Sequence, residues 1–194
     1  MKTTRQADTR KAILQTALDL ISEKGLDKLS LREIARRVGY SPAGLYEYFD
    51  GKDDILWTLA VEADARLRAA ALGVSAELLP EERLVQACLA YVDFAINNAE
   101  YFTIMNSMPT RRGSLEEPVS SESSYSIYLK LVQDMIDNGG VIPRENFGAE
   151  EITYGLWTLI HGMGVLRLAQ LRDFKLDFNT VNRQVIENFI AGLK

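Results

Sequence analysis

The chain has 194 residues, of which 47% are hydrophobic and 25% charged, and its one cysteine, Cys88, excludes an intramolecular disulfide. This length suffices for a sizeable core and fits one domain plus a small additional one. No run reaches the ~18 consecutive apolar residues of a membrane span, and no secretory signal is recognisable. We therefore expect a soluble cytoplasmic protein with no membrane partner.

The net charge of -5 conceals an asymmetry along the chain. Residues 1–52 hold ten Lys or Arg and seven Asp or Glu, a net charge of +3, whereas residues 53–194 carry a net charge of -8. A basic end on an acidic body suits a polyanionic partner. A charge of +3 over 52 residues is also ordinary for a protein surface, so charge alone does not decide the function.

Helical periodicity runs through the chain, and no sustained two-residue alternation marks a strand. We therefore predict an all-α fold of about nine helices, the first containing Ile13 and Ala17 and closing at Gly25. The other predicted helices cover residues 31–38, 42–48, 52–73, 80–95, 101–108, 125–138, 149–171 and 179–193. Between them, residues 109–124 hold two prolines and five serines, which predicts a loop or, alternatively, a lid over a pocket.

The segment 30–52 carries the pattern of a helix-turn-helix. Ser30 and Glu33 have the spacing of a capping box, and Gly39 suits the turn that ends the helix. Ser41 can cap a second helix, in which Pro42 occupies the first position. Two short helices across a tight turn place a helix in a DNA major groove. We predict a DNA-binding domain at 1–52 and a second, helical domain at 53–194, to which the family resemblance given below assigns effector binding and dimerisation.

The last two predicted helices indicate a subunit interface. Few polar side chains lie between Ile152 and Leu166, and a helix that is apolar nearly all round must be covered on more than one side. Glycines in such a helix let another backbone approach, although the core of a monomer could also cover both sides. The predicted interface residues are Gly155, Gly162, Leu166, Val185 and Phe189.

The N-terminal segment closely resembles the signature of the TetR (tetracycline-repressor) family of bacterial transcription regulators. The matching residues are Ile13, Leu14, Ala17, Leu20, Gly25, Ile34, Ala35, Gly39, Ser41, Leu45, Tyr46, Phe49, Lys52, Asp54 and Leu56. They lie within about the first 60 residues. Farther along, Trp157-x-x-x-His161-Gly162 looks like the hallmark of the subfamily with a WHG-type C-terminal domain.

The resemblance implies a homodimer that binds a palindromic operator on double-stranded DNA, with the helix Pro42–Tyr48 of each subunit in the major groove. A small-molecule effector in the C-terminal domain would shift the fourth helix and release the DNA. The alternatives are a DNA-binding architectural or activator protein without an effector and, less well supported, an enzyme. Nucleophile motifs, phosphate-binding loops and metal-ligand spacing are not recognisable, so we expect no cofactor, no metal and no catalytic residue.

Lys52 at a helix start suits a phosphate, because its ammonium group and free backbone N–H groups coincide there. Tyr46 and Tyr48 can donate to phosphates or bases, or else pack beside Phe49. Ala43 and Gly44 are small enough for close approach, although the family often has Gly then Thr there and so gains a hydroxyl contact. The full set of predicted DNA contacts is Arg32, Ser41, Pro42, Ala43, Gly44, Tyr46, Glu47, Tyr48 and Lys52.

Charged residues around this segment have less definite assignments. Arg32 suits a bidentate guanine contact, and Glu47 either accepts from a cytosine or points outward. One of Arg36 and Arg37 is expected to reach phosphate and the other to be solvated. Tyr40, where the family commonly has valine, is expected to pack in the turn. A basic arm that reaches the DNA, or that frays, is expected from Lys2, Arg5, Arg10 and Lys11.

The predicted effector pocket consists of aromatic, methionine and polar positions of the middle helices. Trp157 and His161 share a helix face, and His161 is the one histidine of the chain. Such residues line a core at least as often as a pocket, so each has both interpretations. The predicted pocket residues are Tyr91, Phe94, Asn98, Phe102, Met105, Tyr125, Tyr128, Trp157 and His161.

Overall fold

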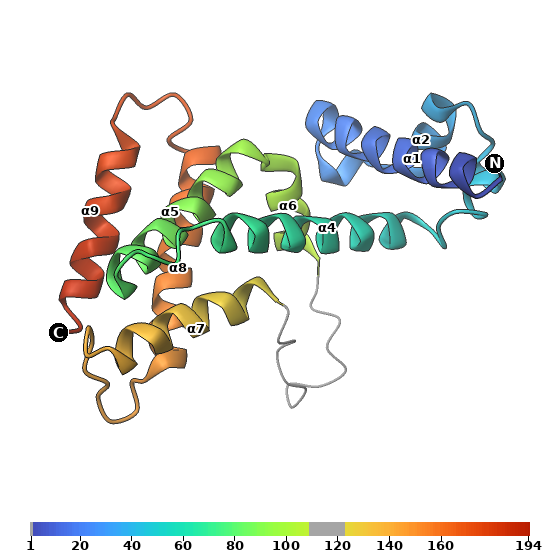
Figure 1. Ribbon diagram of the computed structural model, residues 1–194. Helices are drawn as coiled ribbons and strands as arrows, with labels where there is room; N and C mark the ends of the chain where they lie inside the picture. The colour runs from blue at the N-terminus through green and yellow to red at the C-terminus, as the bar shows by residue number, and fades with distance from the viewer. Residues whose placement is uncertain (1, 109–122) are drawn as a thin grey trace. The chain divides into compact units, whose positions relative to one another are not determined.

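The computed structural model describes residues 2–108 and 123–194, and these residues form an all-α fold of nine helices (Figure 1). The helices are α1 (Lys2–Lys24), α2 (Leu31–Val38), α3 (Pro42–Leu45), α4 (Lys52–Leu72), α5 (Pro80–Asn97), α6 (Ala99–Ser107), α7 (Ser124–Asp137), α8 (Ala149–Leu168) and α9 (Phe178–Ala191), with one 3-10 turn, η1 (Leu26–Lys28). The predicted fold class is confirmed. The predicted loop at 109–124 lies almost entirely outside the described residues.

Contacts divide the chain into two compact units. The first comprises the described residues of 1–63 and 100–111, and the second those of 64–99 and 112–194. α4 therefore begins in the first unit and ends in the second. α6 contributes nearly all of its length to the first unit, where the Tyr101 hydroxyl donates to Glu62 Oε2 at 3.1 Å. The predicted domain boundary after residue 52 stays a prediction.

The first unit is built on local signals that the sequence contains. Ser30 Oγ accepts the backbone N–H of Glu33 at 3.3 Å, and Gly39 ends α2 with a φ of 74°. A left-handed φ at this turn is the conformation that glycine adopts without a steric penalty. Ile13, Ile34 and Leu45 are fully or almost fully buried, so α1, α2 and α3 share one small core.

α3 is shorter than predicted. The expected helix 42–48 stops at Leu45, and the following turn is tighter, with the Tyr46 N–H bonded to the Ala43 carbonyl and the Tyr48 N–H bonded to the Leu45 carbonyl. Such i to i-3 bonds commonly tighten the last turn of a helix. The backbone turns more tightly here and directs Phe49 into the core, where its ring is almost completely buried.

The second unit is centred on α5, which packs against α7, α8 and α9. Its core includes Leu84, Cys88, Met135 and Ile160. Burial raises the pKa of the Cys88 thiol to about 12, so the reactive thiolate is scarce at neutral pH and the residue acts as a small apolar core group. The exposed thiol chemistry of a redox site is therefore not available to Cys88.

α8 buries one face and leaves the other open. Ile152, Leu156 and Ile160 point into the unit, whereas Tyr154 is 63% exposed and Leu166 is 45% exposed. Val185 on α9 is also exposed. The sequence left open the alternative that the core of a monomer covers both sides of this apolar helix. The described chain covers only one side.

Gly155 has a different local role from the one predicted. A Cβ atom at this position would lie 2.8 Å from the Phe189 ring of the same chain. The glycine therefore admits a side chain of α9, not the backbone of another helix. Gly162 does meet open space, since nothing lies within 4 Å of a Cβ built there.

None of the described helices is both long enough and apolar enough to span a lipid bilayer.

Replacing Ser30 by alanine is expected to lower the free energy of unfolding by about 1 kcal/mol, because the N-terminal cap of α2 is lost. Urea denaturation followed by circular dichroism measures the change. Ser30→Asp is the matched control and should retain most of the stability, since a carboxylate can accept the same N–H. Equal loss in both variants would contradict a capping role.

Candidate functional site

The outer face of the α2–α3 pair gathers most of the predicted DNA contacts. Ser41, Pro42, Ala43, Tyr46 and Glu47 are exposed, whereas Leu45 and Phe49 on the opposite side are buried. Ser41 Oγ accepts the Gly44 N–H at 3.0 Å and so caps α3. A one-turn helix with an exposed outer face results, and Tyr46, 57% exposed, is its largest projecting side chain.

Gly44 is not required by the internal packing of this unit. A Cβ at this position would lie 3.4 Å from Ser41 Oγ and 3.5 Å from Tyr40 Cδ1, which is ordinary van der Waals contact. Because Gly44 has no side chain, the surface of α3 is recessed at this position. A partner can therefore approach the backbone closely there.

Tyr48 is held inside the unit to a greater extent than Tyr46. Its ring packs edge-on against Tyr40 with 5.9 Å between the ring centroids, and the hydrogen bond with the Tyr40 hydroxyl raises the pKa of Tyr48. The Tyr40 hydroxyl also lies 3.4 Å from Thr9 Oγ1, so Tyr40 packs in the turn as predicted. Tyr48 therefore anchors the turn, and its hydroxyl already has partners.

Lys52 is half-exposed at the first position of α4, as predicted. The neighbouring backbone is capped from within, since Asp54 Oδ2 accepts the Asp50 N–H at 3.0 Å. Asp53 and Asp54 also place two carboxylates in the first turn of α4. The ammonium group of Lys52 is thus the feature of this helix start that can attract a phosphate.

The predicted basic arm is in part engaged with the rest of the unit. The Arg10 guanidinium lies 4.0 Å from the centre of the Phe49 ring and donates to the Tyr48 carbonyl, so Arg10 fastens α1 to the turn and is not part of a loose arm. Lys11 is exposed on α1. The side chains of Lys2 and Arg5 lie outside the described part of the chain.

Arg36 and Arg37 form ion pairs within the same unit. Arg36 bonds Glu33 at 2.9 Å, and Arg37 pairs with Glu23. The Arg36 side chain is nonetheless 68% exposed, so which of the two arginines reaches phosphate stays a prediction. Hydrogen bonds from Arg36 and Lys24 lower the pKa of Glu33 to about 2, with Arg36 the largest cause. Arg32 is exposed and has no acidic partner among the described residues, which leaves its guanidinium available.

The second unit brings together five of the predicted pocket residues. Trp157 Nε1 donates to the Tyr91 hydroxyl at 3.3 Å, and the same hydroxyl lies 3.0 Å from His161 Nδ1. Burial lowers the pKa of His161 and so favours the neutral ring, whose unprotonated nitrogen can accept the Tyr91 proton. Tyr91, Trp157 and His161 thus form a hydrogen-bonded chain between α5 and α8.

α7 completes this aromatic cluster. Tyr128 donates to the Ala87 carbonyl at 2.9 Å and lies edge-on to Tyr91, and Tyr125 lies edge-on to Trp157. Burial raises the pKa of Tyr91 and of Tyr128. The cluster therefore presents aromatic faces and a few hydroxyl groups in a partly desolvated environment.

The other four predicted pocket residues lie elsewhere. Phe94 and Asn98 line an open groove between α4 and α5 together with Arg66 and Asp93. Phe102 and Met105 lie on α6, in the first unit. Within the second unit, the predicted pocket residues therefore divide between the aromatic cluster and this groove.

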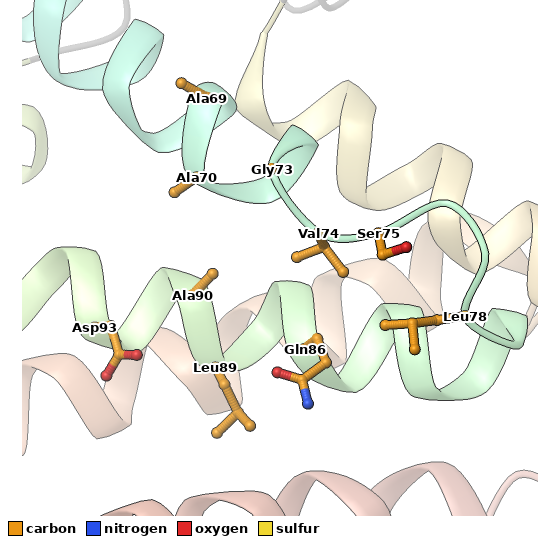
Figure 2. Close-up of a pocket in the computed structure, with 10 residues that line it drawn as sticks. All are labelled: Ala69, Ala70, Gly73, Val74, Ser75, Leu78, Gln86, Leu89, Ala90 and Asp93. Atoms are coloured by element: carbon orange, nitrogen blue, oxygen red, sulfur yellow. The ribbon is translucent and has the colours of Figure 1, made fainter.

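A second groove, of about 420 Å³, runs between the end of α4 and α5 and was not predicted (Figure 2). Ala69, Ala70, Gly73 and Ala90 leave room for it, because small side chains keep facing helices from filling the space between them. Clustered small residues at the end of one predicted helix were the sequence signal that could have indicated it.

Within the described ranges 2–108 and 123–194, no group of three or more His, Cys, Asp or Glu side chains could hold a metal ion. The features that the geometry does offer are an exposed short helix with nearby cations and an aromatic cluster with hydroxyl groups. The first suits a polyanion, and the second suits an apolar or aromatic molecule.

Residues 13–57 match the sequence family described as bacterial regulatory proteins, tetR family. The chain is 25% identical over 185 residues to the HTH-type transcriptional regulator YobS of Bacillus subtilis (strain 168), covering 95% of this chain and 92% of YobS. It is also 25% identical over 164 residues to the HTH-type transcriptional regulator BetI of Escherichia coli, with 81% of each chain covered.

Solved structures agree over the whole length. A protein of unknown function from Rhodococcus sp. RHA1 is similar with a TM-score of 0.79 and 25% identity, and 95% of each chain is covered. The TetR-family regulator PfmR from Thermus thermophilus shares the fold with a TM-score of 0.66 and 19% identity, covering 94% of this chain and 98% of PfmR. The residues that match the family include the capped α2, the turn at Gly39 and α3. The helix-turn-helix segment of this chain, residues 13–57, thus matches that of the TetR family of bacterial regulatory proteins.

Proposed function

We propose that the protein is a homodimeric repressor in the cytoplasm that binds a palindromic operator and leaves it when a small molecule binds to the second unit. The observation that carries the DNA-binding half of this proposal is the outer face of α3. Its exposed residues include Ala43 and Tyr46, while Leu45 on the other side ties it to the core. A helix anchored in this way can enter the major groove of B-DNA, which is about 12 Å wide.

The residues of this face divide into two roles. Lys52 and Tyr46 are suited to phosphate oxygens, which position the protein on the duplex without reading its sequence. Arg32, Ala43 and Glu47 are suited to base edges, through a guanine, a thymine methyl group and a cytosine amino group respectively. Tyr48 contributes chiefly by holding the turn in place.

The open face of α8 and α9 supports the homodimer. Tyr154, Leu166 and Val185 leave apolar surface in water, and a second copy of the chain would cover it. A two-fold interface is the commonest way for identical chains to associate, and it presents two copies of α3 to two half-sites of a palindrome.

The aromatic cluster of Tyr91, Trp157 and His161 supports an effector site with apolar walls and a few polar anchors. α4 is suited to carry the signal, because one continuous helix belongs to both units. The effector must bind the DNA-incompetent state more tightly, since a molecule with equal affinity for both states shifts nothing. The WHG-type subfamily stays a prediction that rests on Trp157, His161 and Gly162.

Tyr46→Ala and Lys52→Ala are each expected to weaken operator binding by about tenfold, because each removes a contact to the phosphate backbone of the DNA. The operator is first obtained by selecting duplexes from the genomic region that flanks the gene. Fluorescence anisotropy over a range of salt concentrations then gives the affinities. The slope of log affinity against log salt should fall in magnitude by about 1 for Lys52→Ala.

Lys130→Ala, an exposed lysine of α7, is the matched control for Lys52→Ala and should bind the operator normally. Unchanged binding by both site variants would show that α3 and the start of α4 are not the DNA interface. A footprint that spreads along DNA without a short protected palindrome would favour an architectural protein instead.

Tyr91→Phe is expected to weaken the effector response about tenfold while leaving operator affinity unchanged, because it removes the hydroxyl that links Trp157 and His161. The probe is a panel of fatty acids and phenolic compounds screened for release of operator DNA. In a Trp57→Phe background, Trp157 is the remaining tryptophan and its emission reports binding. Tyr154→Phe is the control; equal responses in both variants would remove the cluster from the effector site.

Gly162→Glu is expected to convert the dimer to a monomer, since it places a charge on the open face of α8. Analytical ultracentrifugation measures the change. Ala69→Glu, on the exposed side of α4, provides the control for an added helical glutamate. A Gly162→Glu dimer as tight as that of the unmodified protein would show that the interface lies elsewhere.

A further inference from the structure

A surface groove at the start of α8 has both aromatic walls and acidic side chains. Its volume is about 490 Å³, and its lining includes Tyr125, Phe147, Glu150, Glu151, Tyr154 and Phe189. No lysine or arginine is among the residues that line it. Burial, and after it the negative charges of Glu150 and Glu151, raises the pKa of Tyr125, which lines the groove beside them. The groove therefore suits an occupant that combines apolar side chains with positive charge.

This groove is held in shape by contacts within the unit. Gly155 lets the Phe189 ring lie against α8, and Glu151 Oε2 accepts the Gly148 N–H at 2.8 Å at the start of that helix. Phe147 is fixed by two backbone hydrogen bonds with Arg144. An occupant would meet a surface that is already formed, so little conformational entropy would be lost on the groove side.

The segment 172–176, between α8 and α9, has the complementary character. Phe174 is 60% exposed and Leu176 is 49% exposed, and Arg172 and Lys175 lie beside them. Neither of these two cations has an acidic partner within the described part of the chain. Asp173 reduces the net charge of the segment to +1. Two large apolar side chains in water, flanked by cations, are a surface that gains from being covered.

The segment 172–176 is also ordered. The Leu171 N–H donates to the Leu166 carbonyl at 2.8 Å, and the Phe174 N–H donates to the Leu171 carbonyl at 3.1 Å. The Arg167 guanidinium donates to the same Leu171 carbonyl while lying 4.0 Å from the centre of the Phe178 ring. These bonds hold the backbone at the start of the segment, so its exposed side chains project into solvent.

We propose that the segment 172–176 of one subunit docks into the Glu150–Tyr154 groove of a second copy of the chain. This inference rests on the homodimer of the proposed function and adds the contact that fixes how the two copies align. A two-fold axis perpendicular to α8 makes the two α8 helices antiparallel, so the start of one lies beside the end of the other. Each dimer then contains the contact twice.

The spacing along α8 agrees with this arrangement. Gly162 is the position at which a Cβ would meet open space, so it is a natural crossing point for the two helices. Glu150 lies about three turns before Gly162, and α8 ends at Leu168, shortly before the segment 172–176. A crossing near Gly162 would bring the end of α8, which this segment follows, toward the start of the partner's α8, where the carboxylates of the groove lie.

The experiment uses two full-length charge-reversal variants and their mixture. Glu150→Lys alone, and Arg172→Glu combined with Lys175→Glu, are each expected to weaken dimerisation by about tenfold or more, because position 150 then faces side chains of its own sign in every docking contact. When the two variants are mixed, position 150 faces charges of the opposite sign in both contacts of the heterodimer. Sedimentation velocity with one variant fluorescently labelled should then show heterodimers of nearly unmodified affinity.

Three controls keep the outcomes distinct. Glu77→Lys changes an exposed acid in the α4–α5 connection and should dimerise normally, and Phe174→Ala tests the apolar part without changing charge. Helical circular dichroism and thermal melting verify that each variant folds. An unmodified protein that is monomeric throughout would overturn the homodimer and the docking together. A normal dimer that tolerates all these variants, or weakened variants that fail to recover on mixing, would overturn the docking alone.

Discussion

The proposed DNA-binding face depends on the anchoring of one very short helix. α3 has a single turn, and an isolated helix of that length is unstable in water because nucleation costs more than one turn recovers. Its outer face exists in one conformation because Leu45 and Phe49 are buried behind it and Arg10 covers the Phe49 ring. The helix is therefore a product of its tertiary contacts, and α1 and α2 are the support that provides them.

The cations of the first unit are divided between internal contacts and the open surface. Arg10 and Arg37 hold the unit together, through the Phe49 ring and Glu23, and Arg36 is paired with Glu33. A net charge of +3 therefore overstates what the surface offers to a polyanion. The cations outside these pairs include Arg32 and Lys52, which flank α3 in the sequence, and Lys11 on α1. Local placement of charge, and not the total, decides what such a surface can bind.

Much of the fold could be predicted from short-range signals. The bounds of α2 follow from Ser30 and Gly39, and Pro80 marks the start of α5, because caps and breakers act on their nearest neighbours. The length of α3 could not be predicted, because it depends on where Phe49 enters a core formed by residues distant in sequence. The role of Arg10 could not be predicted for the same reason.

The site residues show a similar division. The sequence predicts Tyr91, Trp157 and His161 as neighbours of a pocket, and the structure does bring them within hydrogen-bond distance. Phe94 has the same residue character, yet it lines a groove with Arg66 and Asp93, since periodicity specifies a helix face but not what faces it. The sequence predicted that Gly155 admits the backbone of another helix, whereas within this chain it admits the Phe189 ring. A glycine indicates close approach without identifying what approaches.

The position of α6 has a consequence for how the chain can be divided. The polypeptide leaves the first unit within α4 and returns to it at residues 100–108, where Tyr101 bonds Glu62 and Ile104 is completely buried. A protein truncated after the helix-turn-helix would lose this returning segment and expose the surface it covers. The DNA-reading end is thus a discontinuous module, which cannot be excised or transplanted as a contiguous stretch without designing a replacement for α6.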